Sequence, residues 1–507
     1  MKTLKYYMLI MFTCFVFAAC TNNEYQIVIP KDATVVASFN LKELLADVDI
    51  PEKDMDNLKS LMGAVFNGQD KDKINEMVSG DEPVGIDFSE PIYAFVSEDC
   101  MFGLSMKVSS EDDLDNLFDI LDRQHLCDKP KEKDSYKWTS IMEDFKVAYN
   151  GNTLMICGGM NEKGMKKMFD NDEENSFMAT PNFEKMNANK APIQFFTSLK
   201  NFQDNDMAFI TELLPEGVKA ADVNLITDIV LNKGRADINA ELFSNNEKTQ
   251  SLLVDADKNF KKINGDFIKA PENFFLWMGA GMKGEELLKK FKSMDETNGL
   301  LMMMDRAIDI QKIIKAIDGD MTIVVPELPV DDATDFVLMA KTANTDFLKD
   351  VDYWQEQMKD WNLKMVENDK NNYTLLLDDN FSLNWGVDNK NVFFSSSKAD
   401  YKKTFADTNP MLDEQAADIK NSIFYVCVNL LPVYQKFNTY MDNEFDKDTK
   451  DLVKDIEFPF DKVVFKANNA HSCSLSFSLK NKEQGVFNAL FDFYSKMSGL
   501  MMNAMMR

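Results

Sequence analysis

Apolar and polar side chains alternate in many short runs of this chain, and the clearest run lies near its C-terminus. Between Cys473 and Ser478 every apolar residue is followed by a serine. Cys473, Leu475 and Phe477 therefore share one face of the segment, and the serines share the other. A period of two is typical of a β-strand whose faces meet different surroundings. We expect the apolar face to be the one that is covered by helices.

A second period, of three to four residues, follows many of these strands and predicts amphipathic helices. Ser110 stands as an N-cap before an apolar stripe that begins at Leu114, and Asn481 has the same place before a later stripe. Asn344 or Thr345 is expected to cap a third helix of this kind. Hairpin connections make the strands antiparallel, and the helices need the sheet to cover their stripes. The sequence therefore predicts an α+β fold, with mainly antiparallel sheets covered by amphipathic helices.

The order of these elements occurs twice along the chain. A hairpin and helix over residues 145–169 are matched by a hairpin and helix over 381–405, an offset of 381 − 145 = 236. Three further segments match in the same order and at similar spacing: 35–39 with 274–278, 92–108 with 321–342, and 229–246 with 463–481. Such internal similarity indicates a duplicated architecture. We expect two tandem, structurally similar α+β repeats over residues 29–266 and 267–507.

Three stretches differ from this regular pattern. Residues 51–80 contain several Asp-Lys pairs and predict one or two polar-faced helices. Residues 170–190 and 407–419 are rich in Asn, Asp and Pro. That composition is typical of loops, so we expect both stretches to be linkers.

The N-terminal residues resemble an export signal. Lys2 and Lys5 precede a mostly apolar run over residues 6–17, which is followed by Ala-Ala-Cys20. A charged start, a short apolar run and small residues predict a cleaved signal peptide, here over residues 1–19. A Cys directly after Ala-Ala resembles a bacterial lipobox, in which the thiol is acylated. The alternative is an ordinary signal beside an incidental Cys.

Acylation of Cys20 would make residues 20–28 a lipidated tether and the membrane a partner of the chain. More than one acyl chain on the thiol gives stable anchoring. The sequence contains no second apolar run long enough to cross a bilayer. Its 84 acidic and 56 basic residues give a net charge of −28. Such a charge repels phosphate backbones, so nucleic acid is excluded as a partner.

The cysteines and histidines limit the chemistry. An odd number of cysteines remains after Cys14 and Cys20, without any CxxC spacing. We expect buried free thiols, with one disulfide as the alternative. These cysteines are Cys100, Cys127, Cys157, Cys427 and Cys473. The chain has only 2 histidines, which argues against zinc sites and histidine-dependent catalysis.

One glycine motif has the spacing of a dinucleotide fingerprint. Gly279, Gly281 and Gly284 follow an apolar strand and precede a helix. The corresponding turn of the first repeat, after Phe39, has no glycine, and no acidic residue ends a following strand. We therefore expect a permissive strand-to-helix turn and no cofactor.

The other candidate sites lack essential groups. Asp255 begins a run that resembles a calcium loop, but Phe260 replaces its glycine and Asp266 its final glutamate. His471 and Cys473 lie two residues apart without further metal ligands. No Gly-x-Ser-x-Gly nucleophile motif occurs. We therefore expect no metal site, and the catalytic residues of any activity are unknown.

The opening Ile29-Pro-Lys-Asp-Ala33 and the later Phe39-Asn-Leu-Lys42, together with the lipobox, resemble an uncharacterised Bacteroidales lipoprotein family, domain-of-unknown-function family 4836. The resemblance implies an envelope lipoprotein and supplies no catalytic residues. Related lipoproteins that reach the cell surface carry acidic residues directly after the Cys. Only Glu24 is present here, so we expect an outer-membrane protein that faces the periplasm, with the cell surface as the alternative.

The leading functional hypothesis is a non-catalytic envelope lipoprotein that binds or scaffolds a protein, glycan or lipid partner. It rests on the lack of a convergent polar constellation and on a duplication that enlarges the surface. One alternative is a hydrolase that uses carboxylates in a cleft between the repeats. Another is a carrier of an apolar ligand, which would need a sizeable apolar site.

Overall fold

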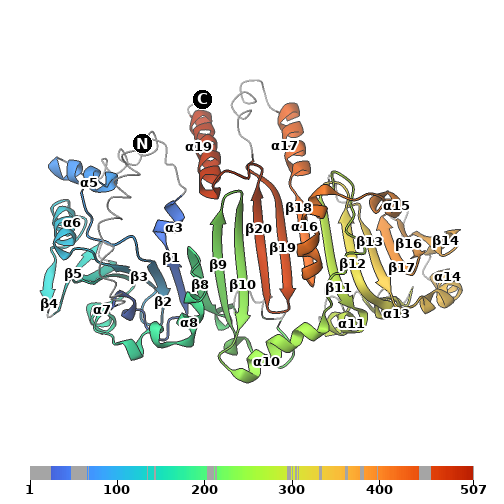
Figure 1. The fold of residues 1–507 in the computed structure, drawn as a ribbon, viewed down its shortest axis with the longest axis horizontal. Helices are drawn as coiled ribbons and strands as arrows, with labels where there is room; N and C mark the ends of the chain where they lie inside the picture. The colour runs from blue at the N-terminus through green and yellow to red at the C-terminus, as the bar shows by residue number, and fades with distance from the viewer. Residues whose placement is uncertain are drawn as a thin grey trace. The chain divides into compact units, whose positions relative to one another are not determined.

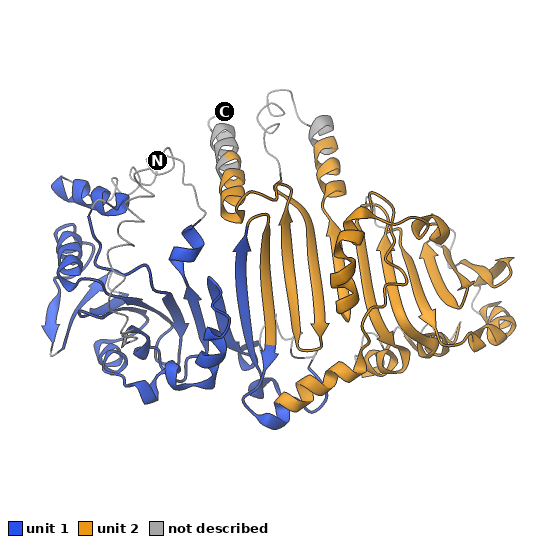
Figure 2. Ribbon diagram, in the orientation of Figure 1, with its two compact units in different colours: residues 1–232, 242–249 blue, residues 233–241, 250–507 orange. Residues whose placement is uncertain are grey.

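The computed structural model describes residues 24–46, 66, 68–80, 82–133, 135–141, 144–202, 211, 214–293, 298–299, 301–302, 305, 308–329, 334–359, 363–376, 382–396, 398–444 and 458–505. Two compact units are present, coloured separately in Figure 2. Unit 1 contains residues 1–232 and 242–249, and unit 2 contains residues 233–241 and 250–507. Both mix helices with antiparallel strands, which confirms the predicted α+β class.

In unit 1 the described strands pair in the order β9-β8-β1-β2-β3-β7-β6-β5-β4 (Figure 1). Every one of these pairs is antiparallel. The strands are β1 (Val35–Phe39), β2 (Ile92–Val96), β3 (Phe102–Lys107), β4 (Lys131–Lys133), β5 (Tyr136–Ile141), β6 (Phe145–Tyr149), β7 (Thr153–Gly158), β8 (Ile193–Ser198) and β9 (Asn224–Asn232).

Helices cover the sheet of unit 1 at two cores. One core packs Tyr25 and Met186 against Tyr93 and Phe95 of β2, and in the other Phe118 stacks on Tyr149 at 4.9 Å. The helices are α2 (Glu24–Ile27), α3 (Leu41–Leu45), α5 (Gln69–Ser79), α6 (Glu111–Arg123), α7 (Glu162–Phe169) and α8 (Pro181–Asn187). Short 3-10 turns are η1 (Glu173–Asn175), η2 (Phe177–Ala179), η3 (Leu199–Phe202) and η4 (Ala220–Asp222).

In unit 2 the described strands pair in the order β10-β20-β19-β18-β11-β12-β13-β17-β16-β15-β14, again antiparallel (Figure 1). Strand β10 belongs to this unit as far as Glu241. The strands are β10 (Arg235–Phe243), β11 (Leu276–Lys283), β12 (Ile317–Val325), β13 (Val337–Thr342), β14 (Lys364–Asp369), β15 (Asn372–Leu376), β16 (Ser382–Asp388), β17 (Asn391–Ser396), β18 (Phe424–Asn429), β19 (Phe460–Asn469) and β20 (Ser472–Leu479).

Two cores of unit 2 lie under helices. Trp354 of α14 lies 5.9 Å from Trp385 of β16 in one core, and Leu412 and Ile419 of α16 pack with Trp277 in the other. The helices are α10 (Glu247–Asp255), α11 (Gly284–Ser293), α13 (Ile310–Ala316), α14 (Val351–Lys359), α15 (Tyr401–Thr404), α16 (Pro410–Asn421), α17 (Leu431–Glu444) and α19 (Val486–Met505). The 3-10 turns are η5 (Ala256–Asn259) and η6 (Asp346–Asp350). None of the described helices is long and apolar enough to cross a membrane.

The prediction of linkers over 170–190 and 407–419 is wrong. Asn409 caps α16 by accepting a hydrogen bond from Met411 N, and Pro410 occupies the first turn, where its missing N–H costs nothing. Leu412 and Ile419 of this helix are fully buried. The earlier stretch contains α8, η1 and η2. The Asn-Pro and Thr-Pro pairs that indicated loops are in fact helix starts.

Candidate functional site

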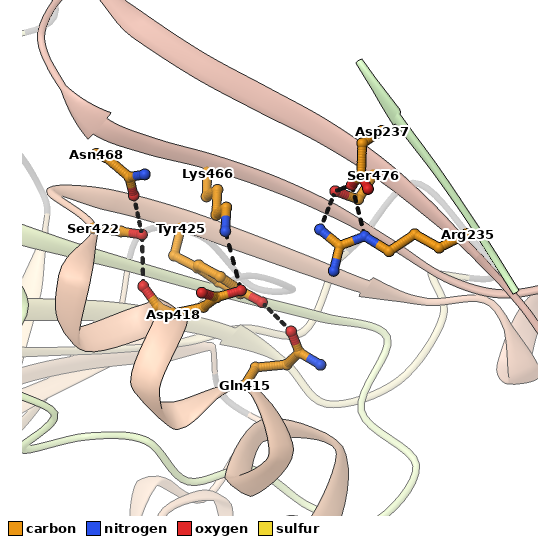
Figure 3. Close-up of polar contacts among 9 residues, drawn as sticks. All are labelled: Arg235, Asp237, Gln415, Asp418, Ser422, Tyr425, Lys466, Asn468 and Ser476. Atoms are coloured by element: carbon orange, nitrogen blue, oxygen red, sulfur yellow. Dashed lines mark hydrogen bonds and ion pairs between the residues drawn. The ribbon is translucent and has the colours of Figure 1, made fainter. Parts of the chain in front are cut away.

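Polar side chains gather on one face of unit 2 where β10 pairs with β20 (Figure 3). Ser476 lies opposite Asp237, and its hydroxyl donates a hydrogen bond to Asp237 Oδ1 over 2.6 Å. Arg235 donates from Nε to the same oxygen at 2.6 Å and from Nη2 to Ser476 Oγ at 2.9 Å. The three side chains close a triangle in which the guanidinium balances the carboxylate charge.

Helix α16 brings a second polar group to the same face (Figure 3). The Tyr425 hydroxyl donates to Gln415 Oε1 at 3.1 Å, and Lys466 Nζ donates to Asp418 Oδ2 at 3.0 Å. At the end of the helix, the Ser422 hydroxyl donates to the Asp418 carbonyl oxygen at 2.8 Å. It also lies 3.2 Å from Asn468 Oδ1, at the end of β19. These contacts fasten α16 to β18 and β19.

The chemical capacity of this polar cluster is small. Ser476 is only 1% exposed, and its hydroxyl already donates to Asp237 and accepts from Arg235. Burial raises the pKa of the neighbouring Cys427 thiol to about 12 and also raises the pKa of Tyr425. A nucleophile or general base must reach a substrate and be activated by a neighbour. The cluster meets neither requirement, so we assign it to the packing of α16.

The opposite face of the same strands is apolar throughout. We expected helices to cover this apolar face, but the serine face is the one that is covered. Ser474, Ser476 and Ser478 are 9%, 1% and 8% exposed, whereas Cys473, Leu475 and Phe477 are only half-buried. The serines are short and lie between the long side chains of Arg235 and Lys462 on the adjoining strands. Those long chains and α16 cover the serine face, which leaves the apolar face less covered.

We call this apolar surface the open face. The ladder registers place its side chains opposite one another on five neighbouring strands. All are apolar, and apart from Ala236 all are half-buried. The open face consists of Ala236, Ile238 and Ala240 of β10; Cys473, Leu475 and Phe477 of β20; Val463, Phe465 and Ala467 of β19; Phe424, Val426 and Val428 of β18; and Leu276 and Met278 of β11. In the described part of the chain, none of them belongs to the buried cores of unit 2.

Aromatic contacts extend the open face towards α19. The ring of Phe477 lies 5.8 Å from Phe460, which lies 5.6 Å from Phe458, which in turn lies 5.9 Å from Phe493 of α19. Helices α17 and α19 project beyond the same end of the strands (Figure 1). Both expose large apolar side chains: Leu431, Val433 and Phe437 on α17, and Phe487, Leu490 and Tyr494 on α19.

A separate open hollow of about 550 Å³ lies between α13 and α14. Some of its polar groups pair with each other or with neighbours, since Gln311 hydrogen-bonds Asp305 and Lys312 pairs with Asp350. It gathers no set of residues for catalysis. Its lining consists of Asp305, Asp309, Gln311, Lys312, Lys315, Tyr353, Trp354 and Gln357.

The glycine motif serves close packing rather than a turn. Strand β11 continues through Gly281, and α11 begins at Gly284. A Cβ on Gly281 would lie 2.1 Å from the carbonyl oxygen of Lys261, and one on Gly284 would lie 1.9 Å from that of Ile314. The glycines therefore do not serve the strand-to-helix turn that we expected. They let the backbone approach that of Lys261 and Ile314 more closely than a Cβ would permit.

The other motifs are accounted for by local contacts. Asp255 pairs with Lys258 at 2.6 Å, and Asp257 accepts a hydrogen bond from Ala470 N. His471 lies in the turn before β20, with Nδ1 3.8 Å from Asp257, while Cys473 belongs to the open face. Among the described residues no three His, Cys, Asp or Glu side chains are grouped as metal ligands would be.

The cysteines fall into two groups. Cys20 and the predicted signal peptide lie outside the described residues. Cys100, Cys127, Cys157, Cys427 and Cys473 are free thiols, and all but Cys473 are buried.

Sequence reasoning missed α16 and the open face. The stripe of Leu412 and Ile419, seven residues apart, together with the cap Asn409, was the available signal for the helix. The open face has no such signal, because alternation shows which residues share a face and not which face is covered.

Known proteins and protein families are similar to this chain to different degrees. A solved structure called "Structure of crystal form I of TP0453" has 14% sequence identity to this chain and a TM-score of 0.25, and the similarity covers 44% of this chain and 79% of that one. A similarity this low carries no structural argument. No curated protein matches the chain. A family described as a domain of unknown function, DUF4836, matches residues 25–490. The match spans most of the 507 residues, so the chain belongs to the DUF4836 family.

Proposed function

We propose that this protein is a non-catalytic binding lipoprotein of the cell envelope, and that the open face of unit 2 receives the acyl chains of a lipid. The observation that carries the proposal is the continuous apolar surface across β10, β20, β19, β18 and β11. Five strands at about 4.8 Å spacing, four with three residues on the face and β11 with two, give an area of roughly 450 Å². A monomer's largest apolar patch is often functional at this size.

The chemistry of the open face favours a ligand without polar groups. Its side chains offer no hydrogen-bonding oxygen or nitrogen. The backbone of its inner strands is already paired on both sides, so no free strand edge is available there for an added strand. An extended polypeptide lying across the face would leave its own amides without partners, at a cost of a few kcal/mol each. Acyl chains have no such groups to satisfy.

We further propose that Cys20 is acylated after removal of residues 1–19, and that the protein is held in the outer membrane facing the periplasm, as in a Bacteroidales lipoprotein. The lipobox-like Ala-Ala-Cys20 supports this proposal. Anchoring would keep the open face close to a source of lipid.

The proposed tandem repeats are supported by the strand orders. The order β9-β8-β1-β2-β3-β7-β6-β5-β4 corresponds element by element to β19-β18-β11-β12-β13-β17-β16-β15-β14. Tyr149 of β6 stacks on Phe118 of α6, and Trp385 of β16 lies against Trp354 of α14, so the expected pair Tyr149 and Trp385 occupies matching surroundings. The expected partner of Phe145, Phe381, lies outside the described residues.

A titration with a fluorescent long-chain fatty acid tests the proposed function. Leu475 lies between Ile238 of β10 and Phe465 of β19 on the open face, and Leu475→Glu places a charge where acyl chains would lie. Saturable binding by the natural chain, weakened at least about tenfold in this variant, supports the proposal; tenfold corresponds to about 1.4 kcal/mol. The matched control is Val254→Glu on α10, a site that is 45% exposed and away from the open face.

Two results would contradict the proposal: no saturable binding, or equal loss in both variants. A parallel arm with phospholipid vesicles identifies the source of the acyl chain. Binding of free fatty acid alone indicates a carrier, whereas vesicle binding that Leu475→Glu removes indicates direct contact with a bilayer.

A further inference from the structure

Unit 1 contains two buried cysteines on neighbouring segments of its sheet. Cys100 lies in the turn that joins β2 to β3, and Cys157 lies on β7, opposite Gly103 of β3. Both side chains are 0% exposed and belong to the same core. The Cys100 sulfur lies 4.0 Å from the carbonyl oxygen of Gly158, the residue after Cys157.

We propose that Cys100 and Cys157 form a disulfide that ties the β2–β3 turn to β7. Their spacing in the sequence gives no sign of a pair, because 57 residues separate them and no CxxC occurs. The fold brings them together because β3 and β7 are neighbours in the sheet. This proposal is independent of acyl-chain binding by unit 2.

Backbone hydrogen bonds hold the turn around Cys100 in place. Ser97 N donates to the carbonyl of Cys100 at 3.0 Å, and Cys100 N donates back to that of Ser97 at 3.4 Å. On the other side, β7 is paired with both β3 and β6. Forming the bond requires the two sulfurs to approach to about 2.05 Å.

The other described cysteines have different neighbours. The Cys127 thiol donates to the carbonyl of Phe118 at 3.6 Å, and the Cys427 thiol lies 3.9 Å from the sulfur of Met411. Cys473 belongs to the open face of unit 2. Among the five free thiols of the described residues, Cys100 and Cys157 are therefore the two that share one core on neighbouring segments of the sheet.

The oxidant is a disulfide, either oxidised glutathione or a thiol-disulfide oxidoreductase. The thiolate of one cysteine attacks a sulfur of that disulfide, which forms a mixed disulfide and releases one thiolate. The second cysteine then attacks the mixed disulfide, which forms the Cys100–Cys157 bond and releases the second thiolate. The two protein thiols lose two electrons and two protons, and the external disulfide is reduced to two thiols. The hydrogen bond from Cys157 lowers the pKa of Cys100 in the folded chain, so Cys100 is the better first nucleophile.

Burial means that the bond forms as the chain folds, so refolding is the proper test. The full chain is refolded with oxidised and reduced glutathione, quenched with acid, alkylated and mapped by mass spectrometry. The proposal predicts one reducible cross-link between the peptides of Cys100 and Cys157, with Cys127, Cys427 and Cys473 alkylated. Alkylation of both Cys100 and Cys157, or cross-links to other cysteines in their place, would overturn it.

Variants and a stability measurement complete the test. Cys127→Ser, a buried cysteine of the same unit, keeps the cross-link, whereas Cys100→Ser leaves Cys157 open to alkylation. The melting temperature of the natural chain rises by several degrees when the bond is present, since a disulfide constrains the unfolded state. Equal melting temperatures with and without reductant would contradict a bond formed in the native geometry, and this readout needs no variant to fold.

Discussion

Gly281→Ala tests whether the glycine motif is required by close packing. The added Cβ would lie 2.1 Å from the Lys261 carbonyl oxygen and 2.6 Å from its carbonyl carbon. Ordinary contact begins at 3.4 Å, so the backbones must separate by about 1.3 Å, the difference between 3.4 and 2.1 Å. That movement strains the hydrogen bonds from Lys261 N to Gly281 O at 3.1 Å and from Gly281 N to Ile423 O at 3.0 Å.

The cost follows from comparison with other overpacked sites. Forcing atoms into a filled site costs about 1–3 kcal/mol. For a unit of this size, about 2 kcal/mol corresponds to a melting temperature lower by roughly 4–8 °C. Calorimetry or tryptophan fluorescence measures the shift, because Trp277 lies on the same strand.

Gly299→Ala is the control, because its added Cβ meets nothing within 4 Å. We expect this change to be neutral or to stabilise the chain by up to about 1 kcal/mol, since Ala favours a helix. Equal melting temperatures for Gly281→Ala and the natural chain would refute the close-packing explanation. Saturable stabilisation of the natural chain by NAD, FAD or ATP that Gly281→Ala removes would instead support nucleotide binding.

Three further predictions follow from other contacts. Arg123 and Gln124 donate hydrogen bonds to Asp70 at 2.7 and 2.9 Å and hold the pKa of this carboxyl below its ordinary value. These bonds fasten α5 at neutral pH and are lost as the pH falls below about 4. Hydrogen exchange in α5 should therefore rise on acidification, and it should rise less in Asp70→Asn. A fragment of residues 233–507 should be more stable to urea than one of 267–507, because Arg235 to Glu241 pair with β20; equal midpoints would contradict this. Cys20→Ser should abolish acylation and release the protein from membranes, and retention after a high-salt wash would count against the lipid anchor.

The sequence predicted most strands and several helices because their periods are local. The strands Val35–Phe39, Ile92–Val96 and Phe145–Tyr149 are found with the predicted bounds. Ser110 caps α6 by accepting from Asp113 N at 3.3 Å, as its position indicated. Alternation and capping depend on neighbouring residues, which a sequence shows directly.

The candidate site was less predictable because it depends on contacts between distant segments. Helix α16 was missed since Pro410 and its polar neighbours resemble a loop, whereas burial of Leu412 and Ile419 stabilises a helix. The serines of β20 are buried beside Lys462 of the adjacent β19 and Arg235 of β10, which is more than 200 positions earlier in the chain. Cys100 and Cys157 share one core because β3 pairs with β7. Each of these features is decided by tertiary packing, which local patterns do not determine.

Mapping the adducts of a photoreactive fatty acid most directly tests the central claim that the open face binds acyl chains. The natural chain is irradiated with the probe, digested and analysed by mass spectrometry, with excess unlabelled fatty acid as competitor. We predict competed adducts on β18, β19 and β20, at residues such as Val426, Phe465 and Leu475. Adducts confined to the hollow between α13 and α14, or spread over the chain without competition, would contradict the account.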